Sequence, residues 1–153
     1  MLFRSRRRFG VAAALVLLGA GAVLGTPRAA GAEAVIWEKW SPEAVAKLRT
    51  EGRIVYVDFT ARWCATCQAN KRLVFHDDEV LHTFAARKIV TLRADWTNQD
   101  PRITAELAAY GRSAVPFNQV WLPGKNEPVI LPELLTPETV LRSEEHTSEL
   151  QSH

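Results

Sequence analysis

Cys64 and Cys67 are the only cysteines in this chain of 153 residues, and two positions separate them. A pair with this spacing can belong to a metal site, a structural disulfide or a redox-active dithiol. A structural zinc site needs four ligands, and His76 and His82 lie outside the usual zinc-finger spacing. A disulfide across two residues closes too small a loop to constrain the unfolded chain much. The pair therefore favours redox chemistry, and we expect no metal and no cofactor.

The position of the two cysteines in the sequence assigns them different tasks. Cys64 stands where a strand gives way to a helix, and unpaired N–H groups at a helix N-terminus stabilise an anion. Such a site lowers a cysteine pKa from ~8.5 to roughly 3.5–7.5, so we expect Cys64 to be the nucleophile. Cys67 follows one turn later on the same face, where it can attack the mixed disulfide and release the reduced partner.

Asp58 interrupts a strand that is otherwise apolar, six residues before Cys64. A buried carboxylate without compensation is costly, so its presence there needs a reason. One interpretation places Asp58 on an exposed face of the strand. The other places it in the interior below the cysteines, where it would accept the proton of Cys67.

Two more residues fit a redox site, and each also has a purely structural interpretation. Trp63 is either a core residue or part of a docking surface beside the nucleophile. Pro116 either simply begins a strand or forms a cis bond with Val115 that exposes backbone next to the cysteines for an incoming chain.

The elements that would position these residues alternate between strands and helices. Apolar and β-branched runs predict strands at residues 54–59, 89–94, 117–122 and 128–131. Capping residues, first-turn prolines and helical spacing predict helices at residues 42–50, 64–75, from 77, 101–110 and from 137. This order predicts an α/β fold, with a central mixed sheet flanked by helices.

Several segments of the sequence resemble those of a known family. VDFTARWCATC together with AVPF is similar to the thioredoxin fold. RADWTNQDPRITAELAAYGRSAVP with LPELLTPE resembles, more narrowly, the C-terminal thioredoxin-like domain of DsbD-type thiol:disulfide interchange proteins. The likeness covers residues 37–141 and includes the spacing of Asp58, Cys64, Cys67 and Pro116. Ala65 and Thr66 stand between the cysteines in place of the Gly-Pro of ordinary thioredoxin, which leaves the redox potential open.

The resemblance implies a protein-disulfide reductase whose catalytic residues are Cys64, Cys67, Asp58, Pro116 and Trp63. It further implies a periplasmic domain that takes electrons from a transmembrane cysteine domain of the same or a partner protein and passes them to periplasmic thiol proteins. Two alternatives remain open: a free-standing secreted reductase, for example in cytochrome assembly, and a soft-metal module that binds Cu(I). The formal charge of +2 gives no support for nucleic acid as a partner.

The N-terminal part of the chain predicts a membrane or export segment. Three arginines at residues 6–8 precede an uncharged stretch that begins at Phe9 and ends at Gly25. Residues 6–25 fit either the last transmembrane helix of a larger protein or a signal segment, and residues 26–36 read as a linker. Both interpretations put the following domain outside the cytoplasm, either anchored in the inner membrane or secreted to the periplasm.

Both ends of the chain resemble a translated sequencing adapter. Residues 142–153 fit one strand of a common adapter, and residues 1–5 fit the opposite strand of the same adapter. Selection on a protein has no reason to produce such a relation, so we leave both ends out of the fold prediction. We expect the native gene to extend beyond both ends and the last helix to be cut short.

Overall fold

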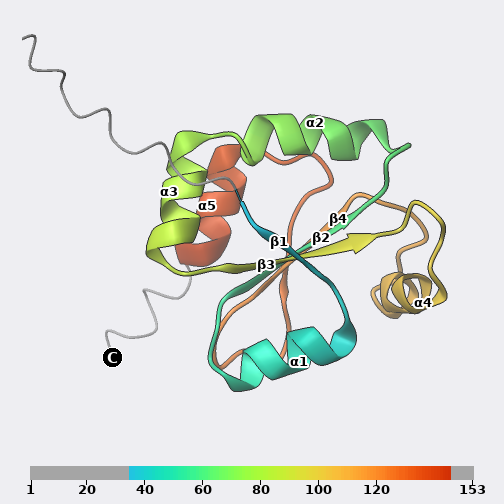
Figure 1. Cartoon of the computed structure of the whole chain (residues 1–153), viewed down its shortest axis with the longest axis horizontal. Helices are drawn as coiled ribbons and strands as arrows, with labels where there is room; N and C mark the ends of the chain where they lie inside the picture. The colour runs from blue at the N-terminus through green and yellow to red at the C-terminus, as the bar shows by residue number, and fades with distance from the viewer. Residues whose placement is uncertain (1–34, 146–153) are drawn as a thin grey trace, which may run out of the picture.

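The computed structural model describes residues 35–145, which form a mixed sheet with helices on both faces (Figure 1). The strands are β1 (Trp37–Lys39), β2 (Val55–Thr60), β3 (Val90–Asp95), β4 (Phe117–Trp121) and β5 (Val129–Ile130). The helices are α1 (Pro42–Thr50), α2 (Ala65–Val74), α3 (Asp78–Ala86), α4 (Pro101–Ala109) and α5 (Pro137–Glu145). The predicted α/β fold with a mixed sheet flanked by helices is confirmed.

Strand β2 lies at the centre of the sheet, whose strand order is β1-β3-β2-β4-β5. Strands β1 and β2 both run parallel to β3, whereas β4 is antiparallel to β2 and β5 is antiparallel to β4. Every residue of β2 is buried because helices cover both faces of the sheet. This double coverage explains why the β2 sequence shows no clean apolar alternation.

The two faces of the sheet differ in composition. Helices α1 and α4 cover one face, and α2, α3 and α5 cover the other (Figure 1). The face under α1 and α4 is called the apolar face below; among its buried residues are Val55, Val57, Phe59, Leu92, Ala94, Phe117, Ile103 and Leu107. The face under α2, α3 and α5 is called the mixed face. It holds an apolar cluster that includes Tyr56, Val74, Phe84, Val120 and Val140, and it also carries Asp58, Arg93 and Asn118.

Helix starts follow the capping residues in the sequence. The Ser41 hydroxyl accepts the N–H of Ala44 at 3.0 Å, and Pro42 occupies the first helical position of α1. Asp77 caps α3 in the same way, since its carboxylate accepts the N–H groups of Glu79 and Val80. The predicted start of α1 at residue 42 is confirmed, and α3 starts at Asp78, one residue after the predicted start at 77.

The structure differs from the sequence prediction at two places. Strand β1, three residues long and paired only with β3, was not predicted because it is too short to show a periodic pattern. Helix α5 runs to Glu145 and thus includes residues 142–145, which the fold prediction left out. Ser143 is buried there, and its hydroxyl donates to the carbonyl of Val140 at 2.6 Å.

Several predicted segments lie outside the described residues. These are the adapter-like residues 1–5, the hydrophobic segment at 6–25, most of the predicted linker and residues 146–153. Within residues 35–145, no helix has the length and apolar character that a membrane crossing requires.

Candidate redox site

Cys64 and Cys67 form a disulfide, with 2.10 Å between the sulfurs and 5.3 Å between the Cα atoms. Cys64 is the N-cap of α2, and the backbone N–H of Cys67 points at its Sγ from 3.1 Å. Cys64 keeps 7% of its surface exposed and Cys67 keeps 2%. Cys64 is thus the more exposed residue of the two, and its Sγ faces a hydrogen-bond donor that would stabilise a thiolate after reduction.

Hydrogen bonds between residues close in sequence hold the turn between β2 and α2. The N–H of Cys64 donates to the carbonyl of Ala61 at 3.3 Å, and the side-chain amide of Gln68 donates to the same carbonyl at 3.1 Å. Ala61 is fully buried and packs with both cysteines and with Val115. The end of the central strand therefore determines where the disulfide lies.

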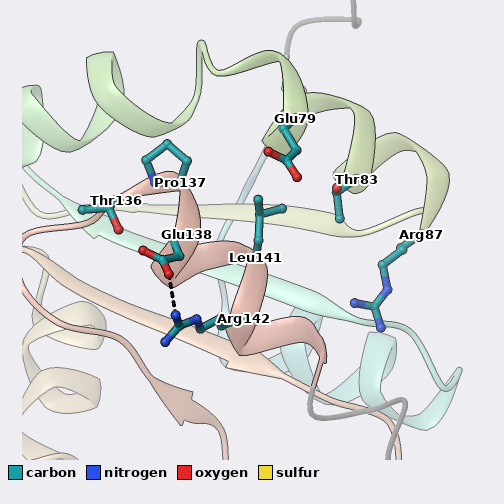
Figure 2. A pocket seen from close by; sticks show the side chains of 8 residues that line it. All are labelled: Glu79, Thr83, Arg87, Thr136, Pro137, Glu138, Leu141 and Arg142. Carbon is teal, nitrogen blue, oxygen red and sulfur yellow. Dashed lines mark hydrogen bonds and ion pairs between the residues drawn. The ribbon is translucent and has the colours of Figure 1, made fainter.

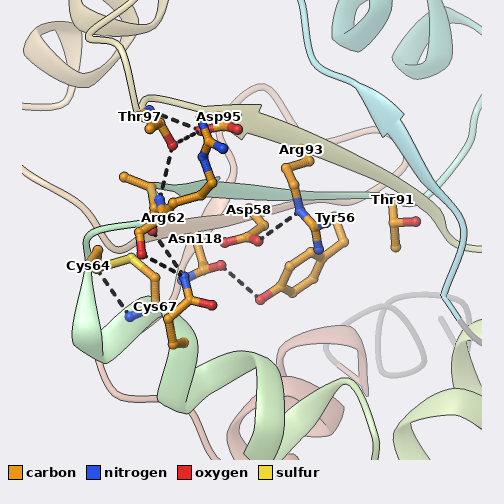
Figure 3. A network of polar contacts seen from close by, with 12 residues as sticks. Tyr56, Asp58, Arg62, Cys64, Cys67, Thr91, Arg93, Asp95, Thr97 and Asn118 are labelled. Carbon is orange, nitrogen blue, oxygen red and sulfur yellow. Dashed lines mark hydrogen bonds and ion pairs between the residues drawn. A yellow bond between two sulfur atoms is a disulfide. The ribbon is translucent and has the colours of Figure 1, made fainter.

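Trp63 lies beside the disulfide with 56% of its surface exposed, yet its indole ring is held in place. Its Nε1–H donates to the backbone carbonyl of Thr97 at 3.1 Å. The hydroxyl of Thr97 accepts the N–H of Arg62 at 3.0 Å (Figure 3). The ring centroid also lies 6.1 Å from that of Trp96. The loop after β3 thus orients an exposed aromatic surface next to Cys64, so Trp63 is not a core residue.

The bond between Val115 and Pro116 is cis, and it lies against the disulfide. The carbonyl oxygen of Val115 is 3.6 Å from the Sγ of Cys64. In the disulfide this is a contact without a hydrogen bond, because the sulfur carries no proton. A segment far along the chain thereby brings a backbone carbonyl to the sulfur of Cys64.

Asp58 is buried, with 4% of its surface exposed, and stands in a row across three strands (Figure 3). Its register partner on β3 is Arg93 and its register partner on β4 is Asn118. The Nε of Arg93 lies 3.5 Å from Oδ2 of Asp58, which makes an ion pair. Neither of these two atoms has a hydrogen-bond partner among the described residues, so the pair is electrostatic in nature.

Burial raises the pKa of Asp58 to about 6, and the positive charges of Arg93 and Lys71 oppose that rise. Lys71 projects from α2, one turn after Cys67, and burial lowers its own pKa. The guanidinium of Arg93 stacks on the ring of Trp37 at 4.2 Å, which anchors this cation at the edge of the site. An acid with a pKa near neutrality is suited to accept and return a proton at physiological pH.

Asn118 adds a neutral polar group to the row. Its Oδ1 accepts a hydrogen bond from the hydroxyl of Tyr56 at 3.0 Å, and its side chain is buried. Its Nδ2 has no hydrogen-bond partner among the described residues. Buried amide groups without a partner are uncommon in folded proteins.

Asn70 links helix α2 to the segment before α5. Its Nδ2 donates to the carbonyl of Glu133 at 2.7 Å, and its Oδ1 accepts the N–H of Leu135 at 3.0 Å. The carboxylate of Glu133 in turn pairs with Arg112, four residues before Pro116, at 3.0 Å. Three segments around the site are thus connected through Asn70 and Glu133.

Sequence reasoning identified Asp58, Cys64, Cys67, Trp63 and Pro116, and the structure brings all five to the region where β2 meets α2. It missed Arg93, Asn118, Lys71, Tyr56 and Asn70. One signal was available for two of them: Arg93 and Asn118 interrupt apolar strands just as Asp58 does. Only the strand order shows that these two residues flank Asp58.

A separate groove of about 800 Å³ lies between α3 and α5 (Figure 2). Glu79, Thr83, Glu138 and Arg142 contribute to its lining, and none of its lining residues belongs to the site described above. Exchange with a protein disulfide takes place at an accessible sulfur and needs no enclosed pocket. Across residues 35–145, no group of three or more His, Cys, Asp or Glu side chains is arranged to hold a metal ion.

Comparisons with known proteins agree with this geometry. A family model described as thioredoxin-like matches residues 36–120. The thiol:disulfide interchange protein DsbD of Vibrio cholerae is 30% identical over 86 residues, which are 56% of this chain and 14% of that protein. The chain thus matches only a small part of that relative.

Two solved structures share the fold. A thioredoxin from Thermus thermophilus has a TM-score of 0.52 and 22% identity, over 78% of this chain and 86% of that one. The oxidised C-terminal domain of DsbD from Neisseria meningitidis has a TM-score of 0.50 and 19% identity, over 76% of this chain and all of that one (100%).

Proposed function

The chain belongs to the thioredoxin-like family, and from that premise we propose that its Cys64–Cys67 pair reduces disulfides of proteins outside the cytoplasm. Family membership and the cysteine pair make it a thiol–disulfide oxidoreductase. The observation that carries the proposal is the environment of Cys64. Its sulfur caps a helix and accepts the N–H of Cys67, and Cys64 is the more exposed residue of the two.

The first step of the proposed reaction is attack by Cys64. In the reduced chain the thiolate of Cys64 attacks one sulfur of the partner disulfide. A bond forms between Cys64 and that sulfur, the partner disulfide breaks, and the second partner sulfur leaves as a thiolate that takes a proton from water. The N–H of Cys67 stabilises the attacking thiolate before this step.

The second step returns the chain to its oxidised state. Cys67 loses its proton to the carboxylate of Asp58, and its sulfur attacks Cys64. The Cys64–Cys67 disulfide forms as the bond between Cys64 and the partner breaks, and the departing partner thiolate takes a proton from water while Asp58 returns its proton to water. The partner thus leaves with two more electrons than it brought. With a pKa of about 6, Asp58 is ionised at neutral pH and ready to accept that proton.

Two surfaces beside the sulfur are proposed to receive the partner chain. Trp63 offers an exposed and oriented ring. The backbone of Val115 and Pro116 lies against Cys64, so an extended segment that brings its disulfide to this sulfur also meets these polar groups.

The proposed electron supply rests on the similarity to DsbD. We propose that a transmembrane cysteine domain, in the same or a partner protein, reduces the Cys64–Cys67 disulfide from the inner membrane. The segment from Phe9 to Gly25 would then tether the domain on the periplasmic side. Mapping the gene to an assembled genome tests this part: a native start codon directly before Arg6, with no membrane-spanning sequence upstream, would leave a secreted reductase instead.

The reductase activity is tested with the full chain. The reduced chain is mixed with insulin as the protein disulfide, and insulin reduction is followed by precipitation of its B chain. The intact chain should reduce insulin, whereas Cys64→Ala should be inactive and Cys67→Ala should accumulate a mixed disulfide with insulin. A reduced chain that leaves insulin intact, or equal trapping by both variants, would contradict the proposal and favour a metal-binding role for the cysteines.

A further inference from the structure

We propose that Asn118 is a positioning residue that stabilises the ionised carboxylate of Asp58, and thereby sets the pH range in which Asp58 takes the proton of Cys67. The inference deepens the proposed function, because it assumes the role given to Asp58 there. It concerns a residue that touches neither the sulfurs nor the partner protein in the reaction described.

The register of the sheet places the two side chains together. Asp58 and Asn118 are direct partners in the antiparallel pair of β2 and β4. Side chains at such positions point to the same face, with Cβ atoms about 4.5–5.5 Å apart. Asn118 is 1% exposed, so its amide faces protein groups rather than solvent.

Two buried polar atoms of complementary type lie in this pair of residues, and they do not hydrogen-bond to each other in this structure. Nδ2 of Asn118 is a donor without a partner among the described residues, and Oδ2 of Asp58 is an acceptor whose ion pair with Nε of Arg93 at 3.5 Å is not a hydrogen bond. The hydroxyl of Tyr56 donates to Oδ1 of Asn118 at 3.0 Å. This bond occupies the acceptor end of the amide and leaves the donor end for the carboxylate.

The other charged groups around Asp58 come from different elements. Arg93 and Asp95 come from β3, and Lys71 comes from α2. The two cations favour the ionised form of Asp58, and Asp95 opposes it. Strand β4 contributes no charge at this level, so the amide of Asn118 is the polar group that β4 offers to the carboxylate. A leucine in its place would put hydrocarbon against Asp58 and favour the protonated acid.

Gln119 provides a matched control on the same strand. It is the next residue of β4, is fully buried, and carries an Nε2 that also lacks a hydrogen-bond partner among residues 35–145. Its side chain points to the opposite face, where its Oε1 accepts the indole N–H of Trp121 at 3.2 Å. Its register partner on β2 is Val57. Replacing Gln119 therefore removes a buried amide of β4 without changing the surroundings of Asp58.

The test is a titration of Asp58 in the full chain, kept oxidised so that no thiol titrates. Carboxyl ¹³C NMR follows Asp58 across the pH range in the wild type and in Asn118→Leu, Tyr56→Phe and Gln119→Leu. We expect Asn118→Leu to raise the midpoint by up to about one pH unit, because hydrocarbon replaces the amide dipole beside the carboxylate. Tyr56→Phe should raise it less, because the amide loses only its anchor, and Gln119→Leu should leave it unchanged.

Three outcomes would overturn the inference: no shift in Asn118→Leu, a shift of equal size in Gln119→Leu, or a downward shift, which would mean that the amide oxygen faces Asp58. If Asn118→Leu does not fold, Asn118→Ser and Tyr56→Phe carry the same test. The titration does not depend on enzymatic activity. If the proposed reductase function is wrong but the inference about Asn118 is right, Asn118→Leu will still shift the Asp58 midpoint in a chain that does not reduce insulin.

Discussion

The two faces of the central strands are built from alternating residues of the same short segments, yet only one of them carries a buried ion pair. On the apolar face, residues such as Val57, Phe59 and Leu92 pack without a buried charge. On the mixed face, Asp58, Arg93 and Asn118 form a polar row that leaves several atoms without hydrogen bonds. Both faces thus contribute apolar packing, but only the mixed face gives up stability, at the polar row next to the disulfide.

The size of this difference follows from the row itself. A buried donor or acceptor without a partner costs about 1–3 kcal/mol. Raising the pKa of Asp58 from its ordinary value of 3.8 to about 6 destabilises the ionised form by about 3 kcal/mol. These costs are large beside the usual net stability of a domain of about 5–15 kcal/mol. We expect side chains with such a stability cost to be retained only where they take part in a reaction.

The largest effect is expected on the apolar face. Leu92→Ala removes a fully buried side chain from the centre of the sheet, so the free energy of unfolding should fall by about 2–5 kcal/mol. Chemical denaturation of the oxidised chain measures this loss. At temperatures where the variant is folded, its rate of insulin reduction should stay close to that of the wild type. If Leu92→Ala kept the stability of the wild type but reduced insulin much more slowly, the apolar face would contribute to the reaction and not only to stability.

The second-largest effect is expected from Asp58→Asn on the mixed face. This substitution should raise the free energy of unfolding at neutral pH, whereas Leu92→Ala should lower it. The folded chain holds the Asp58 proton more tightly than the unfolded chain, because the pKa is raised to about 6 on folding. The resulting stability is fully present below pH 3.8 and is lost as the pH rises through about 6. The wild type should therefore lose about 3 kcal/mol relative to Asp58→Asn between these limits.

Denaturation of both oxidised proteins at a series of pH values checks this difference. Asp58→Asn should also slow insulin reduction near neutral pH, because Cys67 loses its proton acceptor. Parallel stability curves for the two proteins would show that Asp58 keeps an ordinary pKa in the folded chain. An unchanged rate would return Asp58 to a structural role.

The smallest effect is expected at the surface beside the disulfide. Trp63→Ala should lower the rate of insulin reduction about tenfold, the effect of losing one aromatic anchor at an interface. Reduction of a small disulfide such as oxidised glutathione should change little. Leu73→Ala is the matched control, because Leu73 lies on α2 and is exposed to nearly the same extent, 54% against 56% for Trp63. Equal losses in both variants would argue against a specific docking role for Trp63.

Much of the fold followed from local signals in the sequence. Capping residues such as Ser41 and Asp77 act within one helical turn, so the helix starts could be predicted without the rest of the chain. The burial of Asp58 stayed open because it depends on helices that cover both faces of β2. Its neighbours Arg93 and Asn118 were missed because register partners are set by the strand order, which local sequence patterns do not contain.

Alkylation of the reduced full chain measures the difference between the two cysteines. Iodoacetamide is added for short times across a pH series, and mass spectrometry quantifies each modified cysteine. We predict that Cys64 reacts first, with a midpoint well below the ~8.5 of an ordinary thiol, while Cys67 stays protected. Earlier reaction at Cys67, or equal reaction of both thiols near pH ~8.5, would show that Cys64 is not the nucleophile.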